Sequence, residues 1–172
     1  MTFRRTLASL TVAAALVGGA AIMTTDVAGA TPTGKLTLTS APPTSTNVDV
    51  GTPGVGVGDY TTFYAAVTDK TGKAVGWLYG TKTLVALPGE AGMPADRGIF
   101  ENLLTFRFTD GSTIVVGGTQ TAVLGASGFA GSADPGDRAV IGGTGKYAGA
   151  RGVLSTSANP DNSRKQAFVF VK

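Results

Sequence analysis

The sequence contains no cysteine and no histidine, and these two absences exclude much of the chemistry open to a small protein. Without cysteine there is no disulfide, no thiolate nucleophile and no thiolate metal ligand. Without histidine no Ser-His or Cys-His catalytic pair forms, and zinc, haem and most transition-metal sites lose their usual ligands. We therefore predict that the protein holds no metal.

Charged residues are also scarce, at 15% of the chain, with 14 basic residues against 11 acidic ones. Twelve basic and ten acidic residues remain once the predicted leader described below is set aside, so the surface is only mildly basic. No cluster of lysine or arginine is interleaved with aromatic residues. Nucleic-acid binding therefore has no support in the sequence.

The first thirty residues have the pattern of a secretory signal peptide. Arg4 and Arg5 precede an apolar run over 7–23, and Ala28-Gly29-Ala30 forms an A-x-A cleavage site. A membrane-spanning helix needs about twenty apolar residues, and this run is interrupted by threonine and glycine. We predict cleavage after Ala30, a secreted extracellular product and no stable membrane anchor.

The remaining residues form one predicted domain, with an N-terminal arm and the first strand or strands over 31–58 and the rest of a single β-barrel over 59–172. Helical periodicity is missing there, whereas short β-patterned runs alternate with turn residues. The predicted strands cover 60–68, 73–87, 99–109, 112–124, 138–141, 150–157 and 164–171. Several short strands without intervening helices predict an antiparallel sandwich or a closed barrel.

A glycine-rich turn over 140–152 is the most informative stretch of the chain. Its segment from Gly143 to Ala148 fits the dinucleotide fingerprint G-x-G-x-x-A formally. That fingerprint requires a helix to open at its last position, and Gly149 and Gly152 interrupt any such helix. The segment is therefore interpreted as a tight turn between strands, where glycine allows positive φ or close backbone approach.

The same segment closely resembles the signature of the dirigent and allene oxide cyclase-like barrels. The stretch over 106–117 resembles that family's strand, turn and glycine block, and residues 56–59 with 76–81 resemble its first hairpin. This hairpin is equally similar to that of small bacterial barrels that close spirotetronate rings by a [4+2] reaction. The resemblance implies an all-β, eight-stranded antiparallel barrel with an apolar lumen and no cofactor. It also allows a homo-oligomer.

Candidate site residues follow from strand parity and from the resemblance. The catalytic candidates are Glu101, Arg151 and Tyr64, and the ligand-binding candidates are Trp77, Tyr79, Phe106 and Tyr147. An apolar wall around Glu101 would raise the pKa of its carboxyl and make it a general acid or base, whereas at a solvated edge it is a surface charge. Arg151 matches the arginine of the family motif and either stabilises a carboxylate or enolate or ties the turn to a nearby carbonyl.

The sequence leaves open which face of each strand lines the lumen. Glu101 and Arg107 share one face of their strand, and Phe106 lies on the opposite, aromatic face. Tyr64, Trp77 and Tyr79 are either pocket residues or ordinary core aromatics, and Tyr147 lies in the glycine turn at the expected rim. We expect the barrel to bind a small hydrophobic molecule and to direct its cyclisation or isomerisation. The alternatives are a non-catalytic extracellular carrier or dirigent partner of an oxidase, and a structural envelope barrel.

Overall fold

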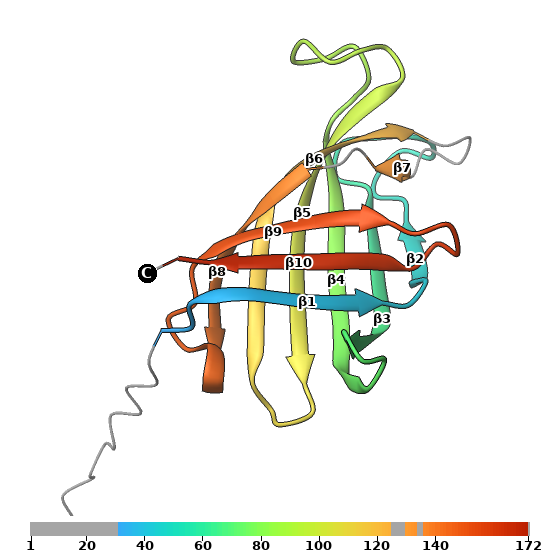
Figure 1. Cartoon of the computed structure of the whole chain (residues 1–172). Helices are drawn as coiled ribbons and strands as arrows, with labels where there is room; N and C mark the ends of the chain where they lie inside the picture. The colour runs from blue at the N-terminus through green and yellow to red at the C-terminus, as the bar shows by residue number, and fades with distance from the viewer. Residues whose placement is uncertain (1–30, 125–129, 134–135, 172) are drawn as a thin grey trace, which may run out of the picture.

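The computed structural model describes residues 31–124, 130–133 and 136–171, which form one antiparallel sheet that closes on itself (Figure 1). Its strands are β1 (Gly34–Ser40), β2 (Thr44–Val48), β3 (Tyr60–Asp69), β4 (Ala74–Ala86), β5 (Arg97–Phe108), β6 (Thr113–Leu124), β7 (Ala130–Ala133), β8 (Gly136–Thr144), β9 (Gly152–Ala158) and β10 (Arg164–Phe170). The neighbour order β1-β10-β9-β8-β6-β5-β4-β3 closes because β1 also pairs with β3. The predicted eight-stranded antiparallel barrel is therefore confirmed.

Two short strands lie outside this ring of eight. β2 pairs with the free edge of β3, and β7 pairs with β6. The described residues contain no α-helix, and a single turn of 3-10 helix, η1 (Gly145–Tyr147), follows β8. Within the same residues no helix is long and apolar enough to span a membrane.

The hairpin turns lie where the sequence predicts them. In the β3–β4 turn, Asp69 Oδ1 accepts hydrogen bonds from the backbone amides of Thr71 (2.8 Å) and Lys73 (3.1 Å), and Gly72 adopts φ 83°. The β5–β6 turn uses Asp110 and Gly111 in the same way, with Gly111 at φ 83°. An Asp side chain that satisfies the turn amides and a glycine that accepts positive φ stabilise each reversal.

The region before the glycine turn differs from the sequence prediction. The sequence predicts a loop through residue 137 and a strand over 138–141, whereas β8 begins at Gly136 and continues to Thr144. Glycine has low strand propensity, but Gly142 and Gly143 pair with Val115 and Ile114 of β6. Cross-strand pairing thus overrides local preference. The predicted leader over 1–30 and residues 125–129 and 134–135 lie outside the described residues. Between these two gaps the sequence predicts loop, whereas residues 130–133 form β7 because they pair with β6.

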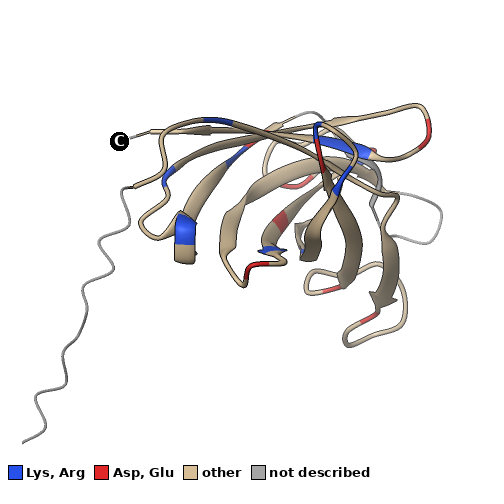
Figure 2. Ribbon diagram, turned by 60° about the horizontal axis from the view of Figure 1, so that its bottom comes forward, with Lys and Arg blue, Asp and Glu red and all other residues tan. Residues whose placement is uncertain are grey.

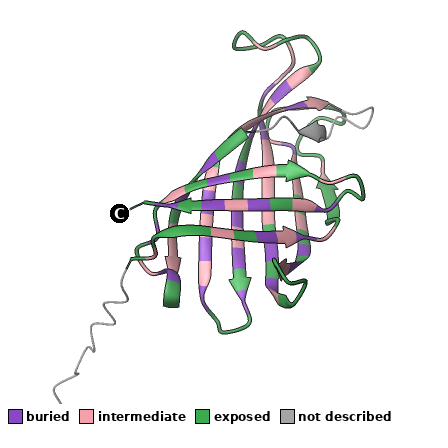
Figure 3. Ribbon diagram, viewed as in Figure 1, coloured by how far each residue is buried: buried purple, intermediate pink, exposed green. Residues whose placement is uncertain are grey.

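Buried and exposed residues alternate along the strands, as the barrel geometry requires (Figure 3). The main core fills the part of the lumen nearest η1 and is dominated by aromatic rings. Phe106 meets Phe168 edge-to-face at 5.0 Å, and Tyr147 stacks between Phe108 and Phe170 at centroid distances of 4.9 and 5.9 Å. A second, smaller cluster of Leu84, Phe100 and Ala122 lies farther along β4, β5 and β6.

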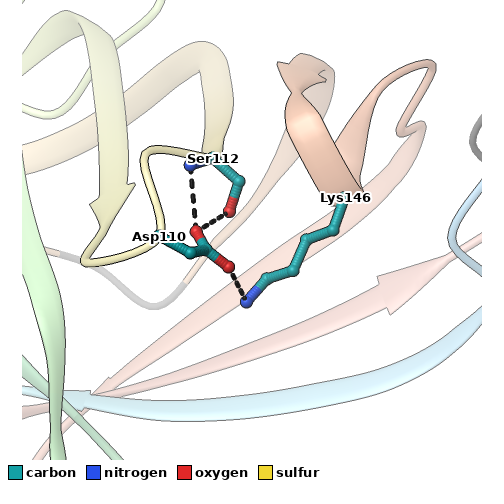
Figure 4. Close-up of polar contacts among 3 residues, drawn as sticks. All are labelled: Asp110, Ser112 and Lys146. Carbon is teal, nitrogen blue, oxygen red and sulfur yellow. Dashed lines mark hydrogen bonds and ion pairs between the residues drawn. The ribbon is translucent and has the colours of Figure 1, made fainter. Parts of the chain in front are cut away.

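One ion pair ties the β5–β6 turn to η1 (Figure 4). Lys146 Nζ lies 2.8 Å from Asp110 Oδ2, while Asp110 Oδ1 accepts hydrogen bonds from the amide of Ser112 at 2.9 Å and its hydroxyl at 2.5 Å. The bond from Lys146, followed by those from Ser112, lowers the pKa of Asp110 from its ordinary value of 3.8. The bond to Asp110 also raises the pKa of Lys146.

Replacement of Lys146 by methionine is therefore expected to cause a small, pH-dependent loss of stability. A carboxyl whose folded pKa is lowered stabilises the fold above its unfolded pKa, and this contribution is lost as the pH falls through the folded pKa. The melting temperature of Lys146→Met should thus lie furthest below that of the wild type near pH 6, and the two should coincide at strongly acidic pH. Thermal melts across this range measure it, with Lys70→Met in the exposed β3–β4 turn as control. A difference that persists in strong acid would contradict the assignment.

Candidate functional site

A layer of polar side chains faces the lumen between the two apolar clusters. We call it the polar layer: Ser40, Lys82, Asn102, Gln120, Arg138, Thr156, Arg164 and Gln166. Its members come from seven neighbouring strands, and cross-strand partners within it include Lys82 with Asn102, Thr156 with Gln166, and Ser40 with Arg164. Buried polar groups are costly unless paired, so a layer of them inside a barrel calls for an explanation.

Hydrogen bonds connect most of the polar layer around the lumen. Arg138 donates to Gln120 Oε1 at 2.9 Å and to Thr156 Oγ1 at 2.6 Å. Thr156 in turn donates to Gln166 Oε1 at 2.8 Å, and Gln166 Nε2 donates to Ser40 Oγ at 3.0 Å. The chain of bonds runs from β6 through β8, β9 and β10 to β1. It holds the Arg138 guanidinium in one orientation inside the barrel.

Two atoms of the polar layer are left without a hydrogen-bond partner among the described residues. They are Asn102 Oδ1, an acceptor, and Arg138 Nε, a donor. Asn102 is 1% exposed and Arg138 is 7% exposed, so solvent does not replace the missing partners. An unsatisfied buried polar group costs about 1–3 kcal/mol. A ligand with both an acceptor and a donor would satisfy the two atoms.

The charge of the polar layer is positive. Lys82, Arg138 and Arg164 all face inward, and within the described residues none of them forms an ion pair. Burial lowers the pKa of Lys82, and repulsion from Arg164 and then Arg138 lowers it further. Burial also lowers the pKa of Arg138. A partly buried positive cluster that forms no ion pair within the described residues is suited to binding a negatively charged oxygen.

The carboxylate of Asp59 is buried but is used to hold a loop. Asp59 is buried at the start of β3, but its two carboxylate oxygens accept hydrogen bonds from the amides of Val50 and Gly56, each at 2.8 Å. The charged residues of the described chain are scattered over strands and turns (Figure 2). The positive character of the lumen is thus a local feature rather than part of a basic surface.

The structure places four of the predicted site residues outside the barrel. Glu101 is exposed on the outer face of β5, between the buried Phe100 and Asn102. Tyr64, Trp77 and Tyr79 are likewise on the outer face, at 47%, 47% and 45% exposure. Side chains alternate between the two faces of a strand. Phe100 and Phe106 point into the barrel, so Glu101 and Arg107 on the opposite face of β5 point to solvent. These four residues therefore do not line the lumen.

Two of them line a groove on the outside. Tyr64 and Tyr79 are cross-strand partners and border an open groove of about 370 Å³. The rest of its lining is Thr44, Thr46, Thr62, Phe63, Gly80, Thr81, Leu103 and Thr105. Trp77 lies beside it, with its ring centroid 6.1 Å from that of Tyr64. The lining of the groove includes no Lys, Arg, Asp or Glu, and the tyrosine hydroxyls are its titratable groups.

The other three predicted residues have separate environments. Arg151 is exposed and donates from Nη1 to the carbonyl of Ala150 at 2.8 Å, which matches the structural alternative for this residue. Tyr147 is 9% exposed and closes one end of the lumen instead of forming an open rim. Phe106 faces the lumen and is 1% exposed. The structure does not bring Glu101, Arg151 and Tyr64 together in one site.

Comparison with known proteins identifies the fold. The sequence matches no protein-family model, and no curated protein matches it. Among solved structures, a pyocyanin demethylase shares 25% identity at a TM-score of 0.59, covering 80% of this chain and 99% of its own. The Diels Alderase AbmU from Streptomyces koyangensis shares 18% identity at a TM-score of 0.54, covering 80% and 68%. A pterocarpan synthase dirigent protein also matches, with 18% identity, a TM-score of 0.49 and coverage of 79% and 87%.

The chain has the dirigent and cyclase-type barrel fold. The resemblance inferred from the glycine turn is thereby confirmed for the fold. The polar layer inside this dirigent and cyclase-type barrel was not predicted from the sequence. A signal for it was present in the strand pattern, since Asn102 interrupts the apolar series Phe100, Leu104 and Phe106 at the same parity. Lys82 interrupts the series Leu78 and Leu84 on β4 in the same way.

Proposed function

We propose that this protein is a secreted barrel that binds a small conjugated molecule bearing an anionic or carbonyl oxygen in its lumen. We further propose that it directs cyclisation or isomerisation of that molecule without a cofactor. The observation that carries the proposal is the polar layer, in which three inward cations and two unsatisfied buried atoms lie between apolar clusters. Export rests on the predicted leader over 1–30.

The chemistry of such a site follows from its electrostatics. The apolar clusters would hold the hydrocarbon part of a ligand and exclude water, and orientation of the reacting atoms then supplies much of the rate acceleration. The Arg138 guanidinium, fixed by Gln120 and Thr156, would stabilise negative charge that develops on an enolate or carbonyl oxygen. Preorganised donors in a water-poor site are effective because they do not need to reorient during the reaction.

The names of two structural neighbours are consistent with this proposal. One is a pyocyanin demethylase and one is a Diels Alderase, so barrels of this fold act on small molecules.

A second candidate function is non-catalytic binding of the same kind of ligand. It is favoured by the position of Glu101 outside the barrel, because the polar layer contains no carboxylate to accept a proton.

The binding proposal is tested with 2-naphthoate, a conjugated carboxylate, and isothermal titration calorimetry on the full chain. Replacement of Arg138 by methionine should weaken binding about 10- to 100-fold, since a hydrogen bond to a charged group is worth about 1.5–3 kcal/mol. Arg107→Met, on the exposed outer face of β5, should leave affinity unchanged. Circular dichroism spectra of both variants serve as the control that they fold.

Two outcomes would contradict the proposal. One is equal affinity for 2-naphthoate in wild type and the folded Arg138→Met variant. The other is equal affinity of the wild type for 2-naphthoate and for the neutral 2-naphthylmethanol, because a positive lumen must prefer the carboxylate.

A further inference from the structure

Lys82 occupies the middle of the polar layer. Its Cα partners are Thr61 on β3 and Asn102 on β5, and it lies on the same inward face of β4 as Gly80 and Leu84. Its Nζ lies 5.7 Å from the centroid of the Phe63 ring, which packs against the main core. Gly80 leaves room for that ring, since a Cβ there would lie 2.2 Å from Phe63 Cζ. The amine of Lys82 is therefore held inside the barrel against an aromatic wall.

The groups facing Lys82 favour its neutral form. Arg138 on β8 and Arg164 on β10 are the charged groups that act on it, and both are positive. From β5 it faces the neutral Asn102, and from β3 it faces Thr61 and Phe63. Asp59 is hydrogen-bonded to its own loop, and Asp137 acts on Arg138 from the outer face of β8, where the Ser155 hydroxyl donates to it.

A buried lysine beside other cations is a known arrangement for an amine nucleophile. Burial and the two arginines lower the pKa of Lys82 from its ordinary value of 10.5. More of this amine is therefore unprotonated at neutral pH than of an ordinary exposed lysine. Lys82 and Arg164 are each partly exposed, so the polar layer is not sealed from solvent at these two residues. The unsatisfied Asn102 Oδ1 belongs to the residue directly opposite Lys82 on β5.

We propose that Lys82 forms an imine with the carbonyl carbon of a small conjugated aldehyde or ketone that carries a carboxylate or another anionic oxygen. This inference rests on the proposed function, because it needs a lumen that admits such a ligand. Arg138 and Arg164 hold the anionic end, and this places the carbonyl group at the amine. Asn102 Oδ1 accepts a hydrogen bond from the carbinolamine hydroxyl.

The step is balanced without an oxidant or reductant. The neutral Lys82 nitrogen bonds to the carbonyl carbon and loses its two protons to solvent, while the carbonyl oxygen takes up two protons from solvent and leaves as water, so that C=N replaces C=O. The imine nitrogen then takes up one proton from solvent. The protonated imine withdraws electrons from the adjacent conjugated carbons. It therefore promotes the isomerisation or cyclisation proposed above and is released again by hydrolysis.

Reductive trapping tests the imine directly. The full chain is incubated near pH 7 with 6-formyl-2-naphthoate and sodium cyanoborohydride, and tryptic peptides are mapped by mass spectrometry. The peptide containing Lys82 should be modified faster than those containing exposed lysines, because a lowered pKa leaves more of its amine unprotonated at this pH. Lys82→Met should remove this fast adduct, and Lys165→Met, an exposed position on β10, should not. Modification spread over the exposed lysines with Lys82 unmodified would overturn the proposal.

A pH–rate profile separates a reactive amine from a merely structural lysine. Arg164→Met removes a positive charge that lowers the pKa of Lys82, so the trapping rate at Lys82 should rise at a higher pH than in wild type. Arg107→Met, which faces solvent, should leave the profile in place. An Arg164→Met profile that is lowered at every pH without moving along the pH axis would overturn the electrostatic part of the proposal.

Calorimetry with 2-naphthoate, which has no aldehyde, distinguishes the two proposals. Binding of 2-naphthoate that depends on Arg138, without any adduct at Lys82, would overturn the imine and leave lumen binding intact. Failure of both 2-naphthoate binding and the adduct would overturn both. Binding together with a fast adduct at Lys82 is the result expected.

Discussion

Replacement of Gly152 by alanine is expected to destabilise the barrel by about 4 kcal/mol or more, or to prevent its folding. Gly152 begins β9 at φ +150°, and a Cβ there would lie 2.1 Å from the carbonyl oxygen of Val169 and 2.9 Å from Phe170 Cα. These atoms belong to the backbone of β10, which pairs with β9 along its whole length. Relief of the clash therefore requires strand separation rather than a side-chain rotation.

Thermal unfolding of the full chain, followed by far-UV circular dichroism, measures this effect. Gly152→Ala should lower the melting temperature by roughly 10 °C or more. Gly136→Ala is the matched control, because it also lies at a strand start and a Cβ there meets nothing within 4 Å. Equal stability of the two variants would show that β9 and β10 do not approach as closely as described. The expected result would show that Gly152, the last glycine of the turn, is needed because β9 and β10 pack closely there.

Replacement of Phe168 by alanine should cost about 3–5 kcal/mol, because it removes a large ring from the centre of the main core. Phe168 is 1% exposed, meets Phe106 edge-to-face at 5.0 Å and stacks on Phe170 at 5.8 Å. The surrounding strands are held by their ladders and can collapse only partly into the cavity. The loss exceeds that of a surface substitution by a wide margin.

Denaturant unfolding of Phe168→Ala and Val169→Ala compares adjacent residues on opposite faces of β10. Val169 is 44% exposed, so its replacement should change stability by no more than about 0.5 kcal/mol. The two variants should have the same denaturant slope and different midpoints. A larger cost at Val169 than at Phe168 would mean that the opposite face of β10 lines the lumen, and the polar layer would then face solvent.

Much of the fold could be predicted because its signals are local. Alternation over 60–68 and 99–109, and turns with glycine at positive φ such as Gly72 and Gly111, report strand and hairpin directly. The first strand or strands were predicted within 31–58 without bounds, because β1 is defined by its pairing with distant strands. Its pairing with β10 joins residues more than a hundred positions apart, and its pairing with β3 depends on closure of the barrel. The placement of the candidate site residues could not be predicted from the sequence. Glu101 was considered for its carboxylate, but parity alone does not decide whether that side chain is inside.

The amino-acid sequence by itself determined the chemical limits and the class of the fold: no thiol or imidazole chemistry, and short antiparallel strands joined by glycine-rich turns. These properties depend on composition and on near neighbours in the chain. Only the tertiary structure decided that Phe106 faces inward and Glu101 outward, and that Lys82, Arg138 and Arg164 converge on one lumen. Three cations on three strands become one site only when the sheet closes, because closure brings β4, β8 and β10 around the same interior.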